Sequence, residues 1–290
     1  MWRARTIGWV MVALGGLSVV ACVVLVVWTH LGQRADERSL WSVAVPSATS
    51  RMLRAWLGLV SVEFIVIVLV VAVLLAFVRR RVSRALAALA LVAGANVTTQ
   101  ILKAGLPRPD MGVGAGLGNT LPSGHVTVVT SLVLAALFVV PASWRSVVAF
   151  LAAGAGTLTG AAALILRWHR PSDVIAAYGV CAIFAGLALL LAERSSRGDG
   201  AHTGPLRLGR PRLVGHALAA LTGAALTGVV LIALGLVPHA DEPSALLGGI
   251  VLSAMGVTCA GVVAFSAWGL DALTGRASRR SLVASTRPRG

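Results

Sequence analysis

Long apolar stretches recur along this chain and constrain its fold more than any other feature. A helix needs about 20 apolar residues to cross the roughly 30 Å of hydrocarbon in a bilayer. Eight stretches approach that length: 7–28, 55–78, 85–106, 126–140, 146–166, 174–192, 213–237 and 246–270. The fourth is short, so we expect its helix to begin about one turn earlier, near Ser123. The sequence therefore predicts an all-α fold, a polytopic membrane helix bundle with about eight transmembrane helices.

The composition agrees with a membrane protein and excludes two other classes. Of the 290 residues, 57% are hydrophobic and only 12% are charged. A soluble domain carries about twice that share of charge, and a disordered chain is far less apolar. The net charge of +15 would suggest a nucleic-acid partner in a soluble protein. In this apolar background a membrane is the better explanation, and we expect no nucleic-acid partner.

The basic residues are distributed unequally between the two sides of the predicted bundle. With the N-terminus inside, 17 of the 25 Lys and Arg residues fall on inner segments and 8 on outer segments. Cytoplasmic loops of membrane proteins carry such an excess. We therefore expect a multi-pass protein of the plasma membrane with both termini in the cytoplasm.

A polar stretch rich in Arg and Gly, residues 193–212, divides the predicted bundle. We interpret it as a cytoplasmic basic linker between a six-span core, residues 1–192, and a C-terminal transmembrane hairpin, residues 213–270. Residues 271–290 are rich in Arg and Ser, and we expect a disordered basic cytoplasmic tail. The hairpin can pack on the core, mediate dimerisation or support a partner. The sequence does not choose among these, and it leaves the oligomeric state open.

Three cysteines, Cys22, Cys181 and Cys259, lie one in each of three predicted spans. A buried free cysteine behaves as a small apolar residue. We therefore expect these three to be packing residues rather than disulfide partners or metal ligands.

Polar and ionisable residues gather in three clusters on the predicted outer side, at residues 103–110, 121–125 and 167–173. Ionisable residues in or beside membrane spans are costly, so each one is a functional candidate. The four cations of these clusters suit a phosphate as counter-charge: they are Lys103, Arg108, Arg167 and Arg170. Ser123 and Gly124 add a hydroxyl and a backbone N–H at a helix start, where anions are favoured.

Two histidines complete these clusters. His125 and His169 can act as acid, base or nucleophile near neutral pH. Asp173 follows His169 by four residues, a spacing that places both on one face of a helix, where the carboxylate can orient the imidazole. The cations, histidines and aspartate predict phosphoryl transfer that requires no metal or other cofactor.

Upstream of the first cluster, Asn96, Gln100 and Lys103 follow one another at helical spacing. We expect this polar stripe to face the interior of the bundle and to direct Lys103 toward the site.

These residues resemble the signatures of the type 2 phosphatidic acid phosphatase superfamily. The similar motifs are Pro122-Ser123-Gly124-His125 and His169-Arg-Pro-Ser-Asp173, preceded by Arg108-Pro109. The resemblance covers about residues 55–192 and implies a six-helix membrane core with its site near one membrane face, commonly the outer one.

The resemblance also implies roles for these positions. His169 would be the nucleophile that forms a phosphohistidine, Asp173 its partner, and His125 the group that protonates the leaving oxygen. The phosphate would be held by four residues: Lys103, Arg108, Ser123 and Gly124.

Two features of this chain depart from the family pattern. The family usually places six residues between its Lys and its Arg-Pro pair, whereas four separate Lys103 from Arg108. The family also places an Arg six residues before the nucleophilic His, and Ala163 stands there in this chain. Arg167 and Arg170 are the candidates for the missing cation.

Together, these features predict a membrane-embedded lipid phosphatase with its active site on the outer face. Its substrate would be a lipid phosphate or diphosphate, either a polyprenyl diphosphate or a lipid like phosphatidic acid. Two alternatives remain open. One is a phosphotransferase on the same scaffold, and the other is a non-catalytic lipid-phosphate binder or transporter.

Overall fold

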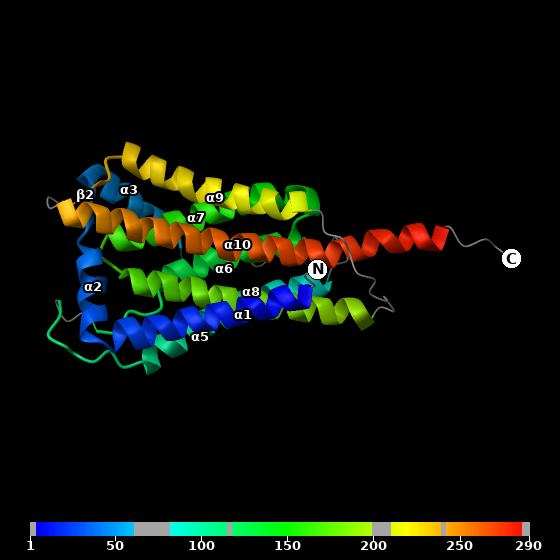
Figure 1. Cartoon of the computed structure of the whole chain (residues 1–290), viewed down its shortest axis with the longest axis horizontal. Helices are drawn as coiled ribbons and strands as arrows, with labels where there is room; N and C mark the ends of the chain where they lie inside the picture. Colours follow the sequence, from blue (N-terminus) through cyan, green and yellow to red (C-terminus); the bar gives the residue numbers. More distant parts are fainter. Residues whose placement is uncertain (1–3, 61–81, 115–117, 199–209, 239–241, 286–290) are drawn as a thin grey trace.

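The computed structural model describes residues 4–60, 82–114, 118–198, 210–238 and 242–285, and its regular structure is almost entirely helical (Figure 1). Long helices run side by side to form an all-α polytopic bundle. They are α1 (Ala4–Ala21), its π-helical continuation η1 (Cys22–Val27), α5 (Val82–Gly105), α6 (Gly124–Val139), α7 (Arg145–Ile165), α8 (Pro171–Gly198), α9 (Arg210–Ala233) and α10 (Glu242–Ser285). A short 3-10 turn, η2 (Ala142–Trp144), leads into α7.

Six helical segments are long and apolar enough to cross a membrane: Ala4–Val27, Ser83–Gly105, Ala142–Ile165, Pro171–Ser195, Val214–Ala233 and Leu246–Leu273. The shorter apolar helix α6 occupies the fourth predicted stretch and begins at Gly124, close to the expected start. These segments correspond to seven of the eight predicted stretches. The eighth, 55–78, overlaps the end of α3 (Ser47–Gly58), and its part from residue 61 lies outside the described residues.

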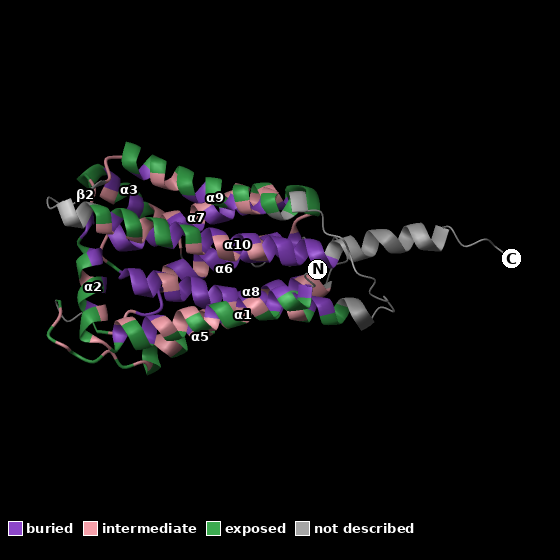
Figure 2. Cartoon of the chain, in the orientation of Figure 1, coloured by how far each residue is buried: buried purple, intermediate pink, exposed green. Residues whose placement is uncertain are grey.

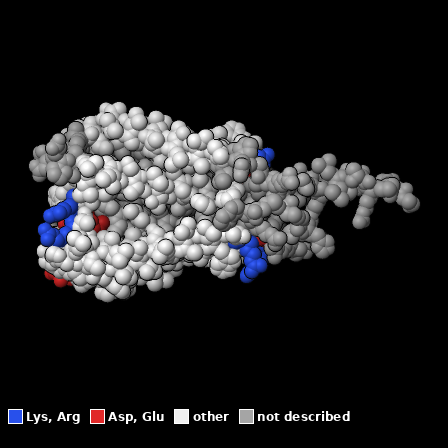
Figure 3. All heavy atoms as spheres, in the orientation of Figure 1, with Lys and Arg blue, Asp and Glu red and all other residues white. Residues whose placement is uncertain are grey.

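The surface between the two ends of the bundle is apolar. On the face shown in Figure 3, described Lys, Arg, Asp and Glu atoms gather toward the two ends, with other residues between them. Many exposed residues along the helices (Figure 2) are large and hydrophobic, for example Leu17, Ile101 and Ile232. An exposed apolar surface of this kind is favourable in contact with lipid and unfavourable in contact with water.

Glycines bring α1 and α8 into close contact. A Cβ atom at Gly15 would lie 2.5 Å from the carbonyl oxygen of Gly179, and one at Gly186 would lie 2.5 Å from that of Gly8. Small residues allow membrane helices to pack backbone to backbone. The first span is therefore an integral part of the core.

The C-terminal hairpin packs on the core. A Cβ atom at Gly223 of α9 would lie 2.1 Å from the carbonyl oxygen of Phe150 of α7. A buried polar network also links α7, α9 and α10. In this network Arg145 donates to Asp271, His216 Nε2 lies 3.0 Å from Asp271 Oδ2, and His216 Nδ1 lies 3.0 Å from Ser146 Oγ.

One end of the bundle is crossed by helix α2 (His30–Leu40) (Figure 1). Thr29 caps this helix, because its side-chain oxygen accepts a hydrogen bond from Gly32 N at 3.0 Å. The chain then forms β1 (Val43–Ala44), which pairs antiparallel with β2 (Val237–Pro238) next to α10. The N-terminus of α1 and the end of α10 lie toward the opposite end of the bundle.

The helices extend into the segments expected to be a linker and a tail. Helix α8 continues to Gly198 and α9 begins at Arg210, which leaves 199–209 outside the described residues. Helix α10 continues to Ser285, through much of the stretch expected to be disordered. Ala, Leu and Arg are good helix formers, so the sequence there can continue the preceding helix.

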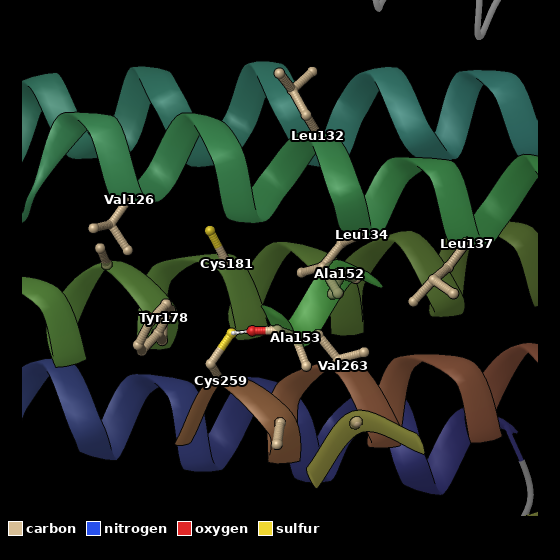
Figure 4. Packing of buried hydrophobic residues seen from close by; sticks show 14 of the residues in the cluster. Val126, Leu132, Leu134, Leu137, Ala152, Ala153, Tyr178, Cys181, Cys259 and Val263 are labelled. Atoms are coloured by element: carbon tan, nitrogen blue, oxygen red, sulfur yellow. Dashed lines mark hydrogen bonds between the residues drawn. The ribbon is translucent and has the colours of Figure 1, made fainter. Parts of the chain in front are cut away.

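The three cysteines are buried and free, as expected for packing residues. Figure 4 shows Cys181 and Cys259 among the apolar side chains of the core. Cys259 Sγ lies 3.8 Å from the carbonyl oxygen of Ala153.

Candidate active site

The three polar clusters meet at the end of the bundle that α2 crosses. The backbone N–H of Ser123 donates to the carbonyl oxygen of Asp173 at 3.0 Å, which joins the second cluster to the third. Lys103 Nζ lies 3.9 Å from where a Cβ atom of Gly124 would stand, which joins the first cluster to the second. Lys103 therefore reaches the site even though only four residues separate it from Arg108.

A tight turn between α7 and α8 positions His169. The backbone N–H groups of Trp168 and His169 donate to the carbonyl oxygen of Ala163 at 3.0 and 3.2 Å. Arg167 adopts a φ of 58° in this turn, a left-handed conformation that costs a non-glycine residue about 1–3 kcal/mol. Its guanidinium stacks over the Trp41 ring, 3.9 Å from the centroid, and this cation–π contact offsets part of that cost.

His169 and Asp173 are in contact, although not on one face of a helix as expected. His169 precedes α8, which begins at Pro171. Asp173, in the first turn of α8, reaches back so that its Oδ2 lies 3.3 Å from His169 Nδ1. The same oxygen accepts a hydrogen bond from Arg170 N at 3.0 Å. Asp173 therefore caps the helix and holds the imidazole at the same time.

Thr120 is a third donor to Asp173. Its hydroxyl donates to Asp173 Oδ2 at 2.6 Å, so this oxygen accepts hydrogen bonds from the loop before α6 and from the turn before α8. Asp173 is fully buried. A buried carboxylate with several donors is held in one place, which in turn fixes the orientation of His169.

His125 and Ser123 stand at the start of α6, beside this pair. The His125 ring lies 5.5 Å from the Trp168 ring, centroid to centroid, and within electrostatic reach of His169 and Lys103. Ser123 occupies the N-cap position, but its hydroxyl makes no capping hydrogen bond. That hydroxyl is buried without a hydrogen-bond partner, and with the N–H groups of the first helical turn it can bind an anion.

Two carboxylates of α2 contact the arginines of the site. Glu37 Oε2 accepts a hydrogen bond from Arg170 Nε at 3.1 Å, and Asp36 Oδ2 lies 3.8 Å from the Arg108 guanidinium. Asp36 also binds Ser172, accepting from its backbone N–H at 3.0 Å and from its hydroxyl at 2.6 Å. Helix α2 thus adds negative charge to a site whose cations come from the core helices and their loops.

Burial and neighbouring charges shift the pKa values of Asp36 and Arg108. Burial raises the pKa of Asp36 to about 6, the Asp173 carboxylate adds to the rise, and Ser172 and Arg108 oppose it. Burial and the neighbouring Arg170 lower the pKa of Arg108, while three carboxylates oppose this change. Both directions reflect like charges held close together away from water.

Four buried donor atoms at this end of the bundle lack a hydrogen-bond partner among the described residues. They are Ser123 Oγ, Arg108 Nη1, Arg167 Nε and Arg170 Nη1. All four belong to the residues predicted to bind phosphate. Because a buried donor without an acceptor is costly, their gathering here favours an anion as the ligand.

The polar stripe on α5 differs from the predicted one by one residue. Asn96 faces α6, as expected, and donates to Ser131 Oγ at 3.1 Å. Gln100 is exposed, and the next polar contact with α6 is made instead by Thr99, whose hydroxyl lies 3.0 Å from Thr127 Oγ1. The inward face of α5 therefore runs through Asn96, Thr99 and Lys103.

Sequence reasoning missed the contributions of Asp36, Glu37, Trp41 and Thr120. The sequence does hold a signal for the two carboxylates. They stand in a short polar segment that begins with Thr29 and falls on the same predicted side as the four cations of the polar clusters.

Among the described residues, no group of three or more His, Cys, Asp or Glu side chains is placed to hold a metal ion.

Comparison with known proteins finds one similarity, in the middle of the chain. No curated protein and no solved structure matches this chain. A family model, that of the PAP2 superfamily, matches residues 84–197. The match covers helices α5 to α8 and the loops that carry both histidines, while α1, α2, α9 and α10 lie outside it. Residues 84–197, less than half of the 290-residue chain, are therefore similar to the PAP2 superfamily.

Proposed function

We propose that this protein is a membrane lipid phosphatase that hydrolyses a lipid phosphate or diphosphate through a phosphohistidine at His169. The observation that carries the proposal is the group of four buried donors without partners around the His169–Asp173 pair. Members of the PAP2 superfamily are generally phosphatases. A lipid is the substrate class that a site at the end of a membrane bundle can reach.

The first step forms the phosphohistidine. Asp173 faces His169 Nδ1 and holds that nitrogen protonated, which leaves the lone pair of Nε2 for in-line attack on phosphorus. The bond from phosphorus to the lipid oxygen breaks as the N–P bond forms, and His125 gives its proton to the departing oxygen. The arginines, Lys103 and Ser123 stabilise the charge on the equatorial oxygens.

The second step releases the phosphate. His125, now neutral, takes a proton from water, and the oxygen of that water attacks phosphorus as the N–P bond breaks. Inorganic phosphate leaves, and both histidines return to their starting states. The cations of this chain carry the charge stabilisation in both steps, so the proposed reaction is metal-independent.

We further propose that the site faces outward in the plasma membrane and that both termini are cytoplasmic. The bias in Lys and Arg supports this orientation, since the sequence assigns 17 of these 25 residues to segments on the side opposite the predicted site.

A phosphate-release assay tests the proposed function. The purified full chain in detergent with EDTA is given phosphatidic acid, a polyprenyl monophosphate and a polyprenyl diphosphate. We expect wild type to release phosphate from at least one of them, and His169→Ala to lose about 10³-fold or more in kcat. His30→Ala is the matched control, because His30 is an exposed histidine on α2.

The other outcomes of the assay separate the alternatives. Full activity in His169→Ala, or no activity of wild type on any lipid phosphate, contradicts the proposal and favours a binder or transporter. A phosphorylated product that appears only when an alcohol acceptor is added identifies a phosphotransferase.

A further inference from the structure

An apolar groove opens between α7, which lies within the part of the chain that matches the family, and α9 and α10, which lie outside it. Its volume is about 550 Å³. Its walls carry no charged residue, and its rim includes Val229, Ile232 and Val257, which are 61%, 66% and 61% exposed. Because these helices lie in the apolar belt, the groove opens toward lipid hydrocarbon rather than water.

The groove occupies the half of the bundle nearest the candidate active site. On α9 it runs from Leu221, at the middle of the helix, to Ile232 near its end. Eleven residues of helix rise about 16 Å, about half of the hydrocarbon thickness. The groove therefore has the depth of one leaflet, on the same side as His169.

Two residues of the groove lie two positions along the chain from residues that contact the cationic site. Val43 lines the groove and lies two residues after Trp41, the ring on which Arg167 stacks. Ala161 of α7 also lines it, two residues before Ala163, whose carbonyl oxygen holds the backbone of His169. An apolar groove with cations at one end matches a molecule with an anionic head and an apolar tail.

A lipid tail suits the groove because none of its lining residues is charged. A hydrocarbon chain is about 4–5 Å wide, from the contact distance between carbon atoms, and fits with room for branches.

We propose that the C-terminal hairpin and α7 form a groove that binds one hydrocarbon tail of the substrate lipid while its phosphate lies at His169. This rests on the proposed function and assigns the hairpin a role in substrate binding.

Two glycines provide the variants for a test. A Cβ atom at Gly228 or Gly249 would meet no atom within 4 Å, although both residues line the groove. Gly228→Leu and Gly249→Leu therefore add volume at the groove, and the new Cβ atom meets no neighbour. Gly215→Leu is the matched control: it lies on α9, its Cβ also meets open space, and it is not part of the groove.

The first readout is KM for a long-tailed lipid phosphate and for a short-tailed analogue with the same head group. We expect the two groove variants to raise KM for the long tail about tenfold, the loss of contact with about two methylene groups. KM for the short tail and both kcat values should not change, and Gly215→Leu should match wild type. Unchanged KM values in both groove variants would overturn the proposal while leaving the phosphatase intact.

The second readout does not depend on activity. The His169→Ala protein is incubated with a lipid phosphate that carries a photoreactive diazirine on its tail, and labelled peptides are mapped by mass spectrometry. We expect labels on α9 and α10 that Gly228→Leu reduces and that unlabelled lipid phosphate displaces better than its dephosphorylated product. Equal displacement by both would mean that the groove holds bulk membrane lipid, against the proposal. An inactive wild type that still shows phosphate-dependent labelling would overturn the phosphatase function alone.

Discussion

Asp173 Oδ2 accepts hydrogen bonds from three parts of the site: the His169 ring, the backbone of Arg170 and the hydroxyl of Thr120. Only the first partner follows from the sequence motif. Thr120 does not touch the proposed reacting atoms, so it is a positioning residue that acts through Asp173.

Replacing Thr120 tests this positioning role. We expect Thr120→Val to lower kcat about tenfold, because Asp173 loses a charge-assisted hydrogen bond and His169 its fixed orientation. Thr120→Ser keeps the hydroxyl and should restore most of the activity. If the Ser variant is as impaired as the Val variant, packing rather than the hydrogen bond is responsible.

Asp36 makes the folded protein less stable as the pH rises. Its pKa in the folded protein is about 6, above the ordinary value of 3.8, so the folded state holds this proton more tightly than the unfolded state. The associated stability is complete below about pH 4 and is lost as the pH rises through 6. The difference between the two pKa values corresponds to about 3 kcal/mol at most.

Asp36→Asn removes this titrating carboxyl and the pH dependence that it gives to stability. Thermal unfolding in detergent should show the variant gaining stability relative to wild type between pH 4 and pH 7. A difference in Tm that stays constant over this range would show that Asp36 does not titrate there.

At the scale of the helices, the contact between α1 and α8 depends on residues without side chains. The backbones meet at Gly15 and Gly179, and a larger residue there must push the helices apart. We expect Gly15→Leu to destabilise the protein by about 1–3 kcal/mol or more, measured as a lower Tm in detergent.

Gly16→Leu is the control for this contact. A Cβ atom at Gly16 meets nothing within 4 Å, so the same added volume points away from α8. Equal losses in both variants would trace the effect to the change in helix composition rather than to the interface.

Helix α2 shows where prediction from the sequence ends. The six helical segments long and apolar enough to cross a membrane could be predicted because an apolar run of about 20 residues has few other stable environments. Helix α2 has no such run, and the pairing of Asp36 and Glu37 with Arg108 and Arg170 joins residues more than 70 positions apart. The motif residues around His169 could be identified from sequence because each motif is local.

At the scale of the whole molecule, the proposed orientation can be tested by labelling. The three native cysteines are buried, so a thiol reagent should label mainly a cysteine introduced at the surface. Leu31→Cys on α2, where Leu31 is 80% exposed, should react with a membrane-impermeant maleimide on intact cells. Ser195→Cys near the other end of α8 should react only after the cells are opened. The reverse pattern would place the site in the cytoplasm.

The carboxylates of α2 affect more than the geometry of the site. Because Glu37 already contacts Arg170, an arriving phosphate replaces one anion with another. A tethered carboxylate competes at an effective concentration in the millimolar range or above, so free phosphate, which has no lipid tail to hold it, should be displaced readily. We expect Glu37→Gln to make inorganic phosphate a stronger inhibitor, seen as a lower inhibition constant. In the wild-type protein, Glu37 would then help to expel the product.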